Sequence, residues 1–367
     1  EAQAAESPLE LEESAEPESK HKTVQEHLLL EHPLTAYSPS YFDQTSPRLF
    51  SYNHRWMISP NLSALTSASF IKGKLPQVGI PLLELDDLIA FYRHPIQYFF
   101  QKRMQIFFRD DELVLSDEEP FSLAPLLDYQ LRKKLLQSAL RGDDLQETAR
   151  FIRQSGVLPV GKAGDVELSK RTHDIVELYE KMQPLMVGDP RRREINVRFN
   201  LPDALVLQGW VNDIYDIGVL KYDVSKVSGR HRFMTWVQHL ASCAAGYNNR
   251  TIYRGLSEQF SFTPVPAELA HAELSKLIET FLEGQRFPLN WIPEPAWKWL
   301  SLREKDEDKA RKEAQNRFDS DRGGDANNPY VRRVYPEWRM IEPGVFAYSE
   351  QLFSEMMNYL EVDNDDN

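Results

Sequence analysis

The stretch that decides the fold runs from residue 204 to residue 225 and reads ALVLQGWVNDIYDIGVLKYDVS. It holds two candidate strands separated by Asp216, Ile217 and Gly218, a short glycine-containing triplet that is typical of a turn. Just before it, residues 194–199 read EINVRF and alternate polar with apolar side chains, as a half-buried strand does. The sequence therefore predicts a β-hairpin beside a third strand.

Helical patterns surround these strands along the sequence. Before them, Asp86 is placed to cap one helix, Pro95 to begin a second, and apolar spacing predicts helices at 124–155 and 167–184. Residues 105–115 are predicted to be extended, with a charged turn. After the hairpin we expect a helix at 232–246, short strands at 250–254 and 258–262, and helices at 266–283, 294–302, 305–318 and 347–360. This order predicts an α/β (α+β) fold, in which a small mixed sheet is surrounded by helices.

The two ends of the chain differ in composition from its middle. Residues 1–34 are predicted to be a disordered acidic linker, because residues 1 to about 22 are Glu, Ala, Ser and Pro with almost no large apolar side chains. Residues 35–80 mix prolines with scattered aromatics and are predicted to be an irregular surface arm. The folded domain is expected at 81–362, and the acidic residues from 361 onward are predicted to be a solvated tail. Because the chain begins with Glu1, we expect a fragment of a longer protein.

Composition narrows the class of protein. The net charge of −13 argues, taken globally, against a sequence-independent DNA-binding protein, although basic clusters lie in the middle of the chain. Cys243 is the single cysteine, so no internal disulfide can form, and a reducing cytoplasm is the expected location. The sequence has no run of 18 or more apolar residues, so no membrane span is expected.

The predicted hairpin also carries the most informative side chains. Zinc, phosphate-loop and nucleophile-elbow motifs are absent, and the nine histidines show no zinc-type spacing, so no cofactor or metal is expected. The hairpin reads Gly209-Trp210-Val211-Asn212-Asp213 and then Leu220-Lys221-Tyr222-Asp223. Restriction-type nucleases place a carboxylate on one strand and an acid and a lysine, two residues apart, on the next. Both side chains then share one face and can reach one metal ion and one phosphate.

This arrangement resembles the exonuclease branch of the PD-(D/E)XK superfamily, which has Gly-x-x-Asp, then Asp-Tyr-Lys, then a helix. More specifically, the chain resembles the C-terminal part of the gamma subunits (RecC) of exodeoxyribonuclease V, the RecBCD helicase–nuclease. The resemblance covers roughly 35–360. The matching stretches are LDDLIAFYRHPIQYFFQKRMQIFFRD at 85–110, DEEPFSLAPLLDYQLRKKLL at 117–136, SGVLPVGKAGD at 155–165, WVQHLASCAAG at 236–246 and FLEGQRFPL at 281–289.

The chain departs from the active nucleases at each metal-binding position. The first carboxylate falls on Asn212, which carries no charge, and the Asp-Tyr-Lys motif falls on Lys221-Tyr222-Asp223, so acid and base are exchanged. A lysine in place of a metal carboxylate repels a divalent cation. The resemblance therefore implies a nuclease-like fold that has lost catalysis, with Asn212, Lys221 and Asp223 as degenerate positions. A rearranged site built from Asp213, Asp216 and Asp223 with Lys226 as base is the alternative, and strand alternation argues against it.

Basic residues near the hairpin are candidates for DNA contact. They are Arg191, Arg192, Arg193, Lys226, Arg230 and Arg232, and the alternative for each is a solvated rim or an ion pair. Trp210, Tyr222 and Trp236 could stack on bases, or could belong to the core.

Three functions remain open. The resemblance implies a scaffold that docks RecB-like and RecD-like subunits and guides or splits DNA strands. An active metal-dependent exonuclease and a pure protein-interaction module are the alternatives. The strand-separating pin that the resemblance implies has two candidate positions, 105–115 and the 209–223 hairpin, and nothing in the sequence chooses between them.

Overall fold

The computed structural model describes residues 24, 28–43, 47–52, 71, 73–108, 123–201, 204–321 and 323–364. The chain divides into two compact units, Glu1–Ser69 and Phe70–Asn367. In the first unit, the described residues include one short 3-10 helix, η1 (Pro39–Tyr41). Most of the predicted linker, residues 109–115 of the predicted extended element, and the last three residues of the predicted tail lie outside the described residues.

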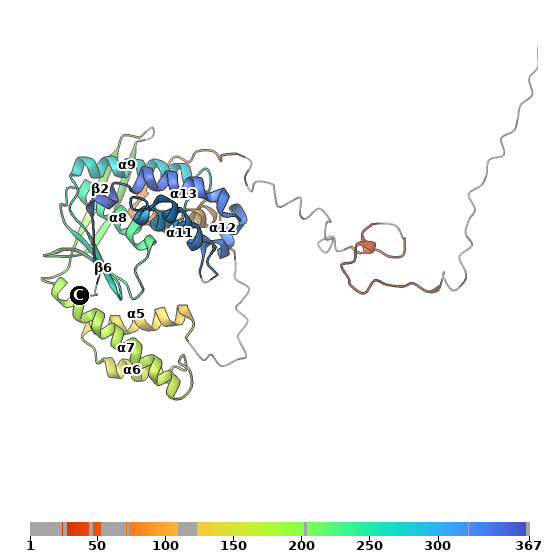
Figure 1. Ribbon diagram of the computed structural model, residues 1–367, viewed down its shortest axis with the longest axis horizontal. Coiled ribbons are helices and arrows are strands. Elements are labelled where there is room, and N and C mark those ends of the chain that lie inside the picture. The colour runs from red at the N-terminus through yellow and green to blue at the C-terminus, as the bar shows by residue number, and fades with distance from the viewer. Residues whose placement is uncertain are drawn as a thin grey trace, which may run out of the picture. The chain divides into compact units, whose positions relative to one another are not determined.

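A seven-stranded mixed sheet organises the described part of the second unit, and helices surround it (Figure 1). The strands are β1 (Leu82–Glu84), β2 (Arg191–Phe199), β3 (Leu205–Tyr215), β4 (Gly218–Tyr222), β5 (Thr251–Arg254), β6 (Glu258–Phe262) and β7 (Leu360–Asn364). Their order is β1-β3-β4-β5-β6-β7, and β2 also pairs with β3. The β1–β3 and β4–β5 pairs are parallel and the others antiparallel, which confirms the predicted mixed sheet and the hairpin at its centre.

The central strand β3 has two partners along one of its sides. Its first half pairs with β1, through residues 206–208, and its last two residues pair with β4. The opposite side is taken by β2 along almost the whole strand. Among the described strands, residues 209–213 therefore have no partner on the side of β1 and β4. The register with β2 also shifts between Arg191 and Arg193, and Asp213 has a φ of 58°, so the strand bulges beside this gap.

Helices cover the sheet in two groups. The first group comprises α3 (Leu85–Arg93), α4 (Pro95–Tyr98), α8 (Gly229–Ala244), α9 (Ala267–Gly284), α10 (Pro293–Leu302), α11 (Glu307–Asp319), α12 (Pro329–Val334), α13 (Trp338–Phe353) and α14 (Met356–Tyr359). The second comprises α5 (Pro125–Arg141), α6 (Leu145–Gln154) and α7 (Lys162–Met182). Short turns of other helix types are η3 (Phe99–Arg103), η4 (Gln183–Leu185) and η5 (Asp325–Asn327). None of the described helices is long and apolar enough to span a membrane.

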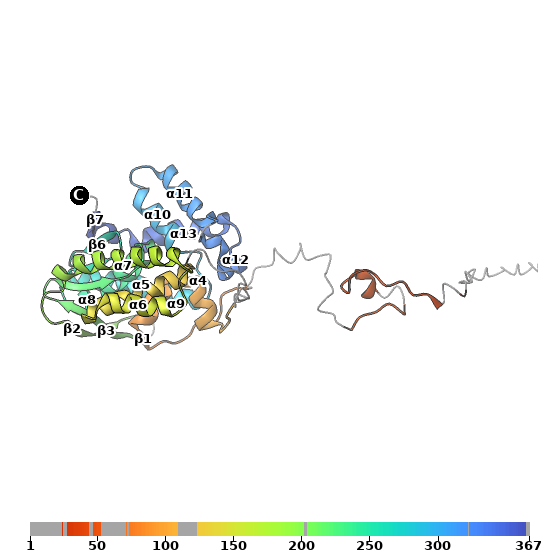
Figure 2. The ribbon, with the colours of Figure 1, turned by 90° about the horizontal axis from the view of Figure 1, so that it is seen from below.

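Each group of helices has its own hydrophobic core. Phe233, Trp236 and Leu240 of α8 are fully buried in the larger core, which joins the sheet to α3, α9 and α13. Cys243 is buried there too. The smaller core lies among α5, α6 and α7, which lie side by side (Figure 2) and apart from α9 and α13 (Figure 1). Val224, just beyond β4, belongs to this smaller core, so the end of β4 meets both groups.

Three predicted helix boundaries are wrong for local reasons. The predicted helix 124–155 is two helices, because Gly142 adopts a left-handed conformation with φ of 76° after α5 and Asp144 then caps α6. Asp86 lies inside the first turn of α3, whose N-cap residue is Glu84. The predicted helix 347–360 begins earlier, at Trp338, and continues through Pro343.

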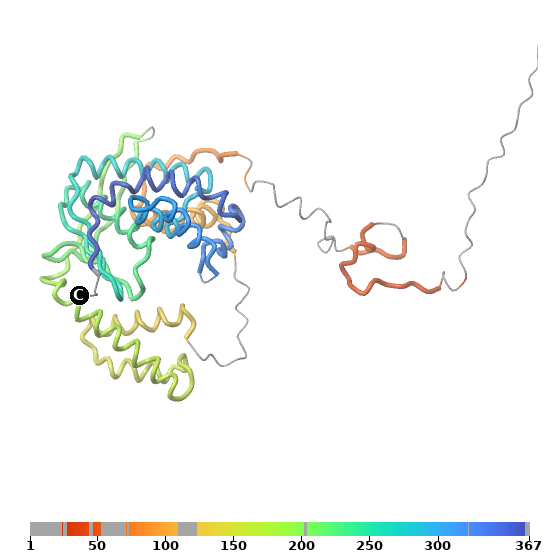
Figure 3. Tube along the Cα trace, viewed as in Figure 1, coloured from red at the N-terminus to blue at the C-terminus, as the bar shows by residue number. Residues whose placement is uncertain are grey.

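Two predictions about charged segments are also wrong. The strand predicted at 194–199 begins earlier, at Arg191, so Arg191, Arg192 and Arg193 form the start of β2. The acidic C-terminal segment is not a solvated tail, because its residues up to Asn364 form β7, and the chain thus returns to the sheet (Figure 3). Glu361 of β7 forms an ion pair with Arg250, which offsets its charge at the sheet edge.

Candidate functional site

The hairpin lies on a cleft with a volume of about 1080 Å³. Its walls come from the β3–β4 hairpin, α3, α5 and the first half of α8. Asn212, Lys221 and Asp223, the three positions at which the resemblance implies lost catalysis, all line this cleft. The structure therefore brings together the three residues that the sequence singled out.

The gap in the sheet explains where the cleft forms. Gly209, Trp210 and Asn212 line it, and they fall in the part of β3 that has no strand partner on the β1 and β4 side. Gly209 also lets α3 come close to β3, because a Cβ atom there would lie 2.7 Å from Cβ of Leu85. The part of β3 without a strand partner, next to the closely packed α3, thus leaves room for the cleft at the centre of the sheet.

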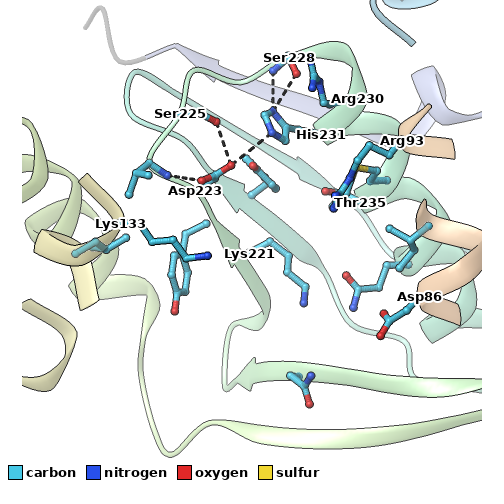
Figure 4. A pocket seen from close by; sticks show the side chains of 18 of the residues that line it. Asp86, Arg93, Lys133, Lys221, Asp223, Ser225, Ser228, Arg230, His231 and Thr235 are labelled. Atoms are coloured by element: carbon cyan, nitrogen blue, oxygen red, sulfur yellow. Dashed lines mark hydrogen bonds and ion pairs between the residues drawn. The ribbon is translucent and has the colours of Figure 1, made fainter. Parts of the chain in front are cut away.

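Lys221 projects into the middle of the cleft from β4, and Asp86 of α3 projects into the same open space (Figure 4). The Lys221 side chain is half-buried, and its ammonium has no hydrogen-bond or ion-pair partner within the described ranges. Burial lowers the pKa of Lys221 below its ordinary value, against the opposing effect of the carboxylates of Asp213 and Asp86. The cleft floor therefore holds a cation that no neighbouring carboxylate directly neutralises.

Asp223 faces away from Lys221 and is held by its own loop (Figure 4). Its carboxylate accepts hydrogen bonds from the Val224 backbone N–H at 2.7 Å and from Ser225 Oγ at 3.0 Å, and His231 Nε2 lies 3.6 Å away. Burial raises the pKa of Asp223, but these hydrogen bonds outweigh burial and hold the pKa below its ordinary value. The carboxylate is thus occupied as a structural acceptor.

The other carboxylates named in the sequence do not converge on this point. Asp216 lies in the turn and forms a 2.7 Å ion pair with Arg191. Across the part of the chain that the structure describes, no three His, Cys, Asp or Glu side chains are grouped closely enough to hold a metal ion. Within the described residues, the carboxylates of the cleft therefore do not form a three-ligand metal site.

Positive charge is in excess around the cleft, in contrast to the chain as a whole. The cationic lining residues are Arg93, Lys133, Arg192, Lys221, Lys226 and Arg230, and the carboxylates are Glu84, Asp86 and Asp223. These cations come from α3, α5, β2, β4, the loop after β4 and the start of α8, so they lie on several walls of the cleft. Such an arrangement attracts a phosphate chain.

The structure separates the six basic residues that the sequence proposed for DNA contact. Arg192, Lys226 and Arg230 line the cleft, whereas Arg191 and Arg193 do not. Arg232 is 4% exposed, forms an ion pair with Glu258 and has its guanidinium 4.2 Å from the Trp297 ring centre. A phosphate cannot reach a side chain enclosed in this way, so the prediction for Arg232 is wrong.

The three aromatic residues that could stack on bases differ in their burial. Trp236 is fully buried in the larger core, and Tyr222 is half-buried against the smaller one. Trp210 is 46% exposed at the cleft, with the guanidinium of Arg192 lying 4.3 Å from its ring centre. Trp210 is therefore the one of these three that can offer a free ring face to a ligand.

Sequence reasoning missed Asp86, Arg93 and Lys133, which lie on helices far from the hairpin in sequence. They are polar positions of amphipathic helices, and the helical pattern alone does not say which exposed positions converge on a distant strand. The matching stretches at 85–110 and 117–136 contain all three, so the resemblance was the available signal.

Comparison with known proteins gives a consistent result. A family model described as the RecC C-terminal domain matches residues 81–304. RecBCD enzyme subunit RecC of Escherichia coli (strain K12) is 28% identical over 279 residues, 76% of this chain and 24% of that protein. The subunit of the same name from Haemophilus influenzae is 25% identical over 272 residues, covering 70% and 24%. That from Mycobacterium tuberculosis is 24% identical over 304 residues, covering 78% and 27%. The chain spans about a quarter of the length of these relatives.

Proposed function

The chain belongs to the RecC family through its C-terminal domain, and from this premise we propose that it is a non-catalytic, nuclease-like scaffold domain. In this proposal it works in the cytoplasm within a RecBCD-type helicase–nuclease complex that serves DNA repair and recombination. It docks the RecB-like and RecD-like subunits and guides or splits DNA strands.

One observation carries the non-catalytic part of the proposal. Lys221 occupies the cleft at the position where the resemblance calls for a metal-binding carboxylate, and the carboxylate of Asp223 is bound by its own loop. A neutral Asn212 on the neighbouring strand adds no charge that could hold a cation. Phosphoryl transfer by nucleases of this class depends on a divalent ion, so this cleft supports binding without cleavage.

Calorimetric titration with Mn²⁺ tests this proposal directly. We expect no stoichiometric heat for the full chain, and no cleavage of linear DNA with Mg²⁺ or Mn²⁺, because the carboxylates do not converge. A double variant, Asn212→Asp with Lys221→Asp, should gain stoichiometric Mn²⁺ binding, since it places two acids on adjoining strands near Asp86. Lys312→Asp on the exposed face of α11 is the matched charge control and should gain none.

Stoichiometric Mn²⁺ binding by the unaltered chain together with cleavage of linear DNA, both removed by Asp223→Ala, would establish the active-nuclease alternative. The pure interaction module is separated by the salt dependence of binding to forked DNA. A steep decrease in affinity with increasing salt supports DNA handling. A flat response would favour the pure interaction module, with which the net charge of −13 also agrees.

A further inference from the structure

We infer that the cleft binds the backbone of single-stranded nucleic acid, and that the ammonium of Lys221 replaces the divalent cation that an active nuclease places against a phosphate. This inference rests on the proposed function, because it takes the cleft to be a DNA-handling site without metal. Beyond that function, it specifies that the bound strand is single, which residues contact it, and that binding does not need a metal ion.

The position of Lys221 supplies the first argument. Its ammonium stands in the floor of the cleft, half-buried and without an ion-pair partner in the described part of the chain. A buried charge without a partner is unfavourable, and its cost is offset when an anion enters and pairs with it. Burial lowers the pKa of Lys221, and a phosphate bound beside the ammonium should raise this pKa again.

The surrounding cations supply the second argument. Arg93 of α3, Lys133 of α5 and Arg192 of β2 are exposed and face the cleft from different walls. A single small anion would engage one or two of them, but a chain of phosphates can engage all of them in turn. The ligand class that matches cations distributed around a cleft of about 1080 Å³ is therefore a polyanion that can enter it.

The aromatic platform at the rim selects a single strand. Trp210 is 46% exposed, and the guanidinium of Arg192 lies over its ring at 4.3 Å, so an unpaired base would stack on the exposed part of this Trp–Arg pair. In a duplex the bases are stacked on one another and cannot use this surface. We therefore expect an unpaired strand to bind this cleft more tightly than a duplex of the same length.

Fluorescence anisotropy with labelled oligothymidylate of roughly 16 nucleotides tests the inference, because single-strand sites extend to about that length. The full chain is titrated in EDTA at several salt concentrations. We expect binding that does not require a divalent metal. Lys221→Met should weaken it roughly tenfold and reduce the salt slope by about 0.7, the value for one phosphate contact on a single strand. Lys312→Met, at an exposed lysine of α11, should change neither quantity.

Thermal unfolding separates a binding role from a structural one. Lys221→Met should keep or raise the melting temperature, since it removes a half-buried cation without a partner; a structural role would lower the melting temperature. As a second variant, Trp210→Ala should weaken oligothymidylate binding roughly tenfold, because base stacking on an aromatic ring is lost.

Four outcomes would overturn the inference. These are no binding by the unaltered chain at low salt, loss of binding in EDTA, an unchanged salt slope in Lys221→Met, or equal competition by a duplex of the same length. Each leaves the Mn²⁺ result untouched, so the inference can fail while the non-catalytic scaffold stands. Conversely, stoichiometric Mn²⁺ binding by the unaltered chain would remove the proposed function first.

Discussion

Replacing Glu294 by alanine is expected to lower the free energy of unfolding by about 3 kcal/mol, the scale of losing a buried charged acceptor. Glu294 is 7% exposed at the start of α10, and its carboxylate serves the first turn of α8. It accepts hydrogen bonds from the backbone N–H of Gly229 at 3.1 Å and of Arg230 at 3.2 Å, and from Nε of Arg230 at 3.3 Å. Alanine leaves the buried N–H of Gly229 and the part-buried N–H of Arg230 without this acceptor.

The pH dependence of this loss follows from the sign of the pKa shift. Burial raises the pKa of Glu294, but the hydrogen bonds and charge of Arg230 outweigh burial and hold it below the ordinary value of 4.5. A carboxylate with a depressed folded-state pKa stabilises the fold above pH 4.5, and this stabilisation is lost as the pH falls through the folded-state pKa. Urea unfolding at pH 7 should therefore show the full difference in free energy of unfolding between the unaltered chain and Glu294→Ala. Acidification should reduce this difference.

Two further variants control this measurement. Glu294→Gln keeps an oxygen acceptor without the charge, and its loss should be smaller than that of alanine. Glu268→Ala removes an exposed acid from the first turn of α9 and should change stability by less than about 0.5 kcal/mol. Equal losses in Glu294→Ala and Glu268→Ala would refute the assignment of Glu294 as the acceptor for α8.

Gly218→Ala should destabilise the fold by about 3 kcal/mol or more, through overpacking at the centre of the sheet. Gly218 begins β4 with a φ of 137°, and a Cβ atom there would lie 2.2 Å from the backbone oxygen of Arg250. That oxygen accepts the Val219 backbone N–H at 2.9 Å, so β4 and the chain entering β5 would have to separate. Because Lys221 lies on β4, the same change should weaken oligothymidylate binding.

Chemical denaturation measures the effect, with Gly79→Ala as the matched control. A Cβ atom added at Gly79 would meet no other atom within 4 Å, and the residue has no positive φ, so alanine there should be nearly neutral. A loss below about 1 kcal/mol for Gly218→Ala would mean that β4 can move away from Arg250 at little cost, contrary to tight packing in protein interiors.

The parts of the fold that a local pattern encodes were predictable. Strand alternation and the turn at Asp216, Ile217 and Gly218 located β3 and β4 correctly. The acidic strand β7 was not predictable, because its pairing with β6 and the ion pair of Glu361 with Arg250 join residues about a hundred positions apart. The first turns of α13 were missed because Pro343 argues locally for a break, whereas burial of Ile341 and Val345 in the larger core stabilises the helix across it.

The site residues that are close in sequence were predictable, whereas those that tertiary packing brings to the cleft were not. Asn212, Lys221 and Asp223 were identified because they share one hairpin, and they line one cleft. Whether a given arginine faces that cleft depended on packing. Arg192 and Arg232 look alike in sequence, yet Arg192 is exposed beside Trp210 and Arg232 is enclosed beside Trp297. Only the tertiary structure distinguishes them.

The interrupted pairing of β3 has a consequence for its backbone amides. Strand amides near the middle of a sheet normally exchange their hydrogens with solvent slowly, because exchange requires the sheet to open. Between residues 209 and 213, β3 has no described strand partner on the side of β1 and β4, since these strands pair only with residues 206–208 and 214–215. Hydrogen exchange in this central strand should therefore be slow at both ends and faster at the amides between them that point away from β2.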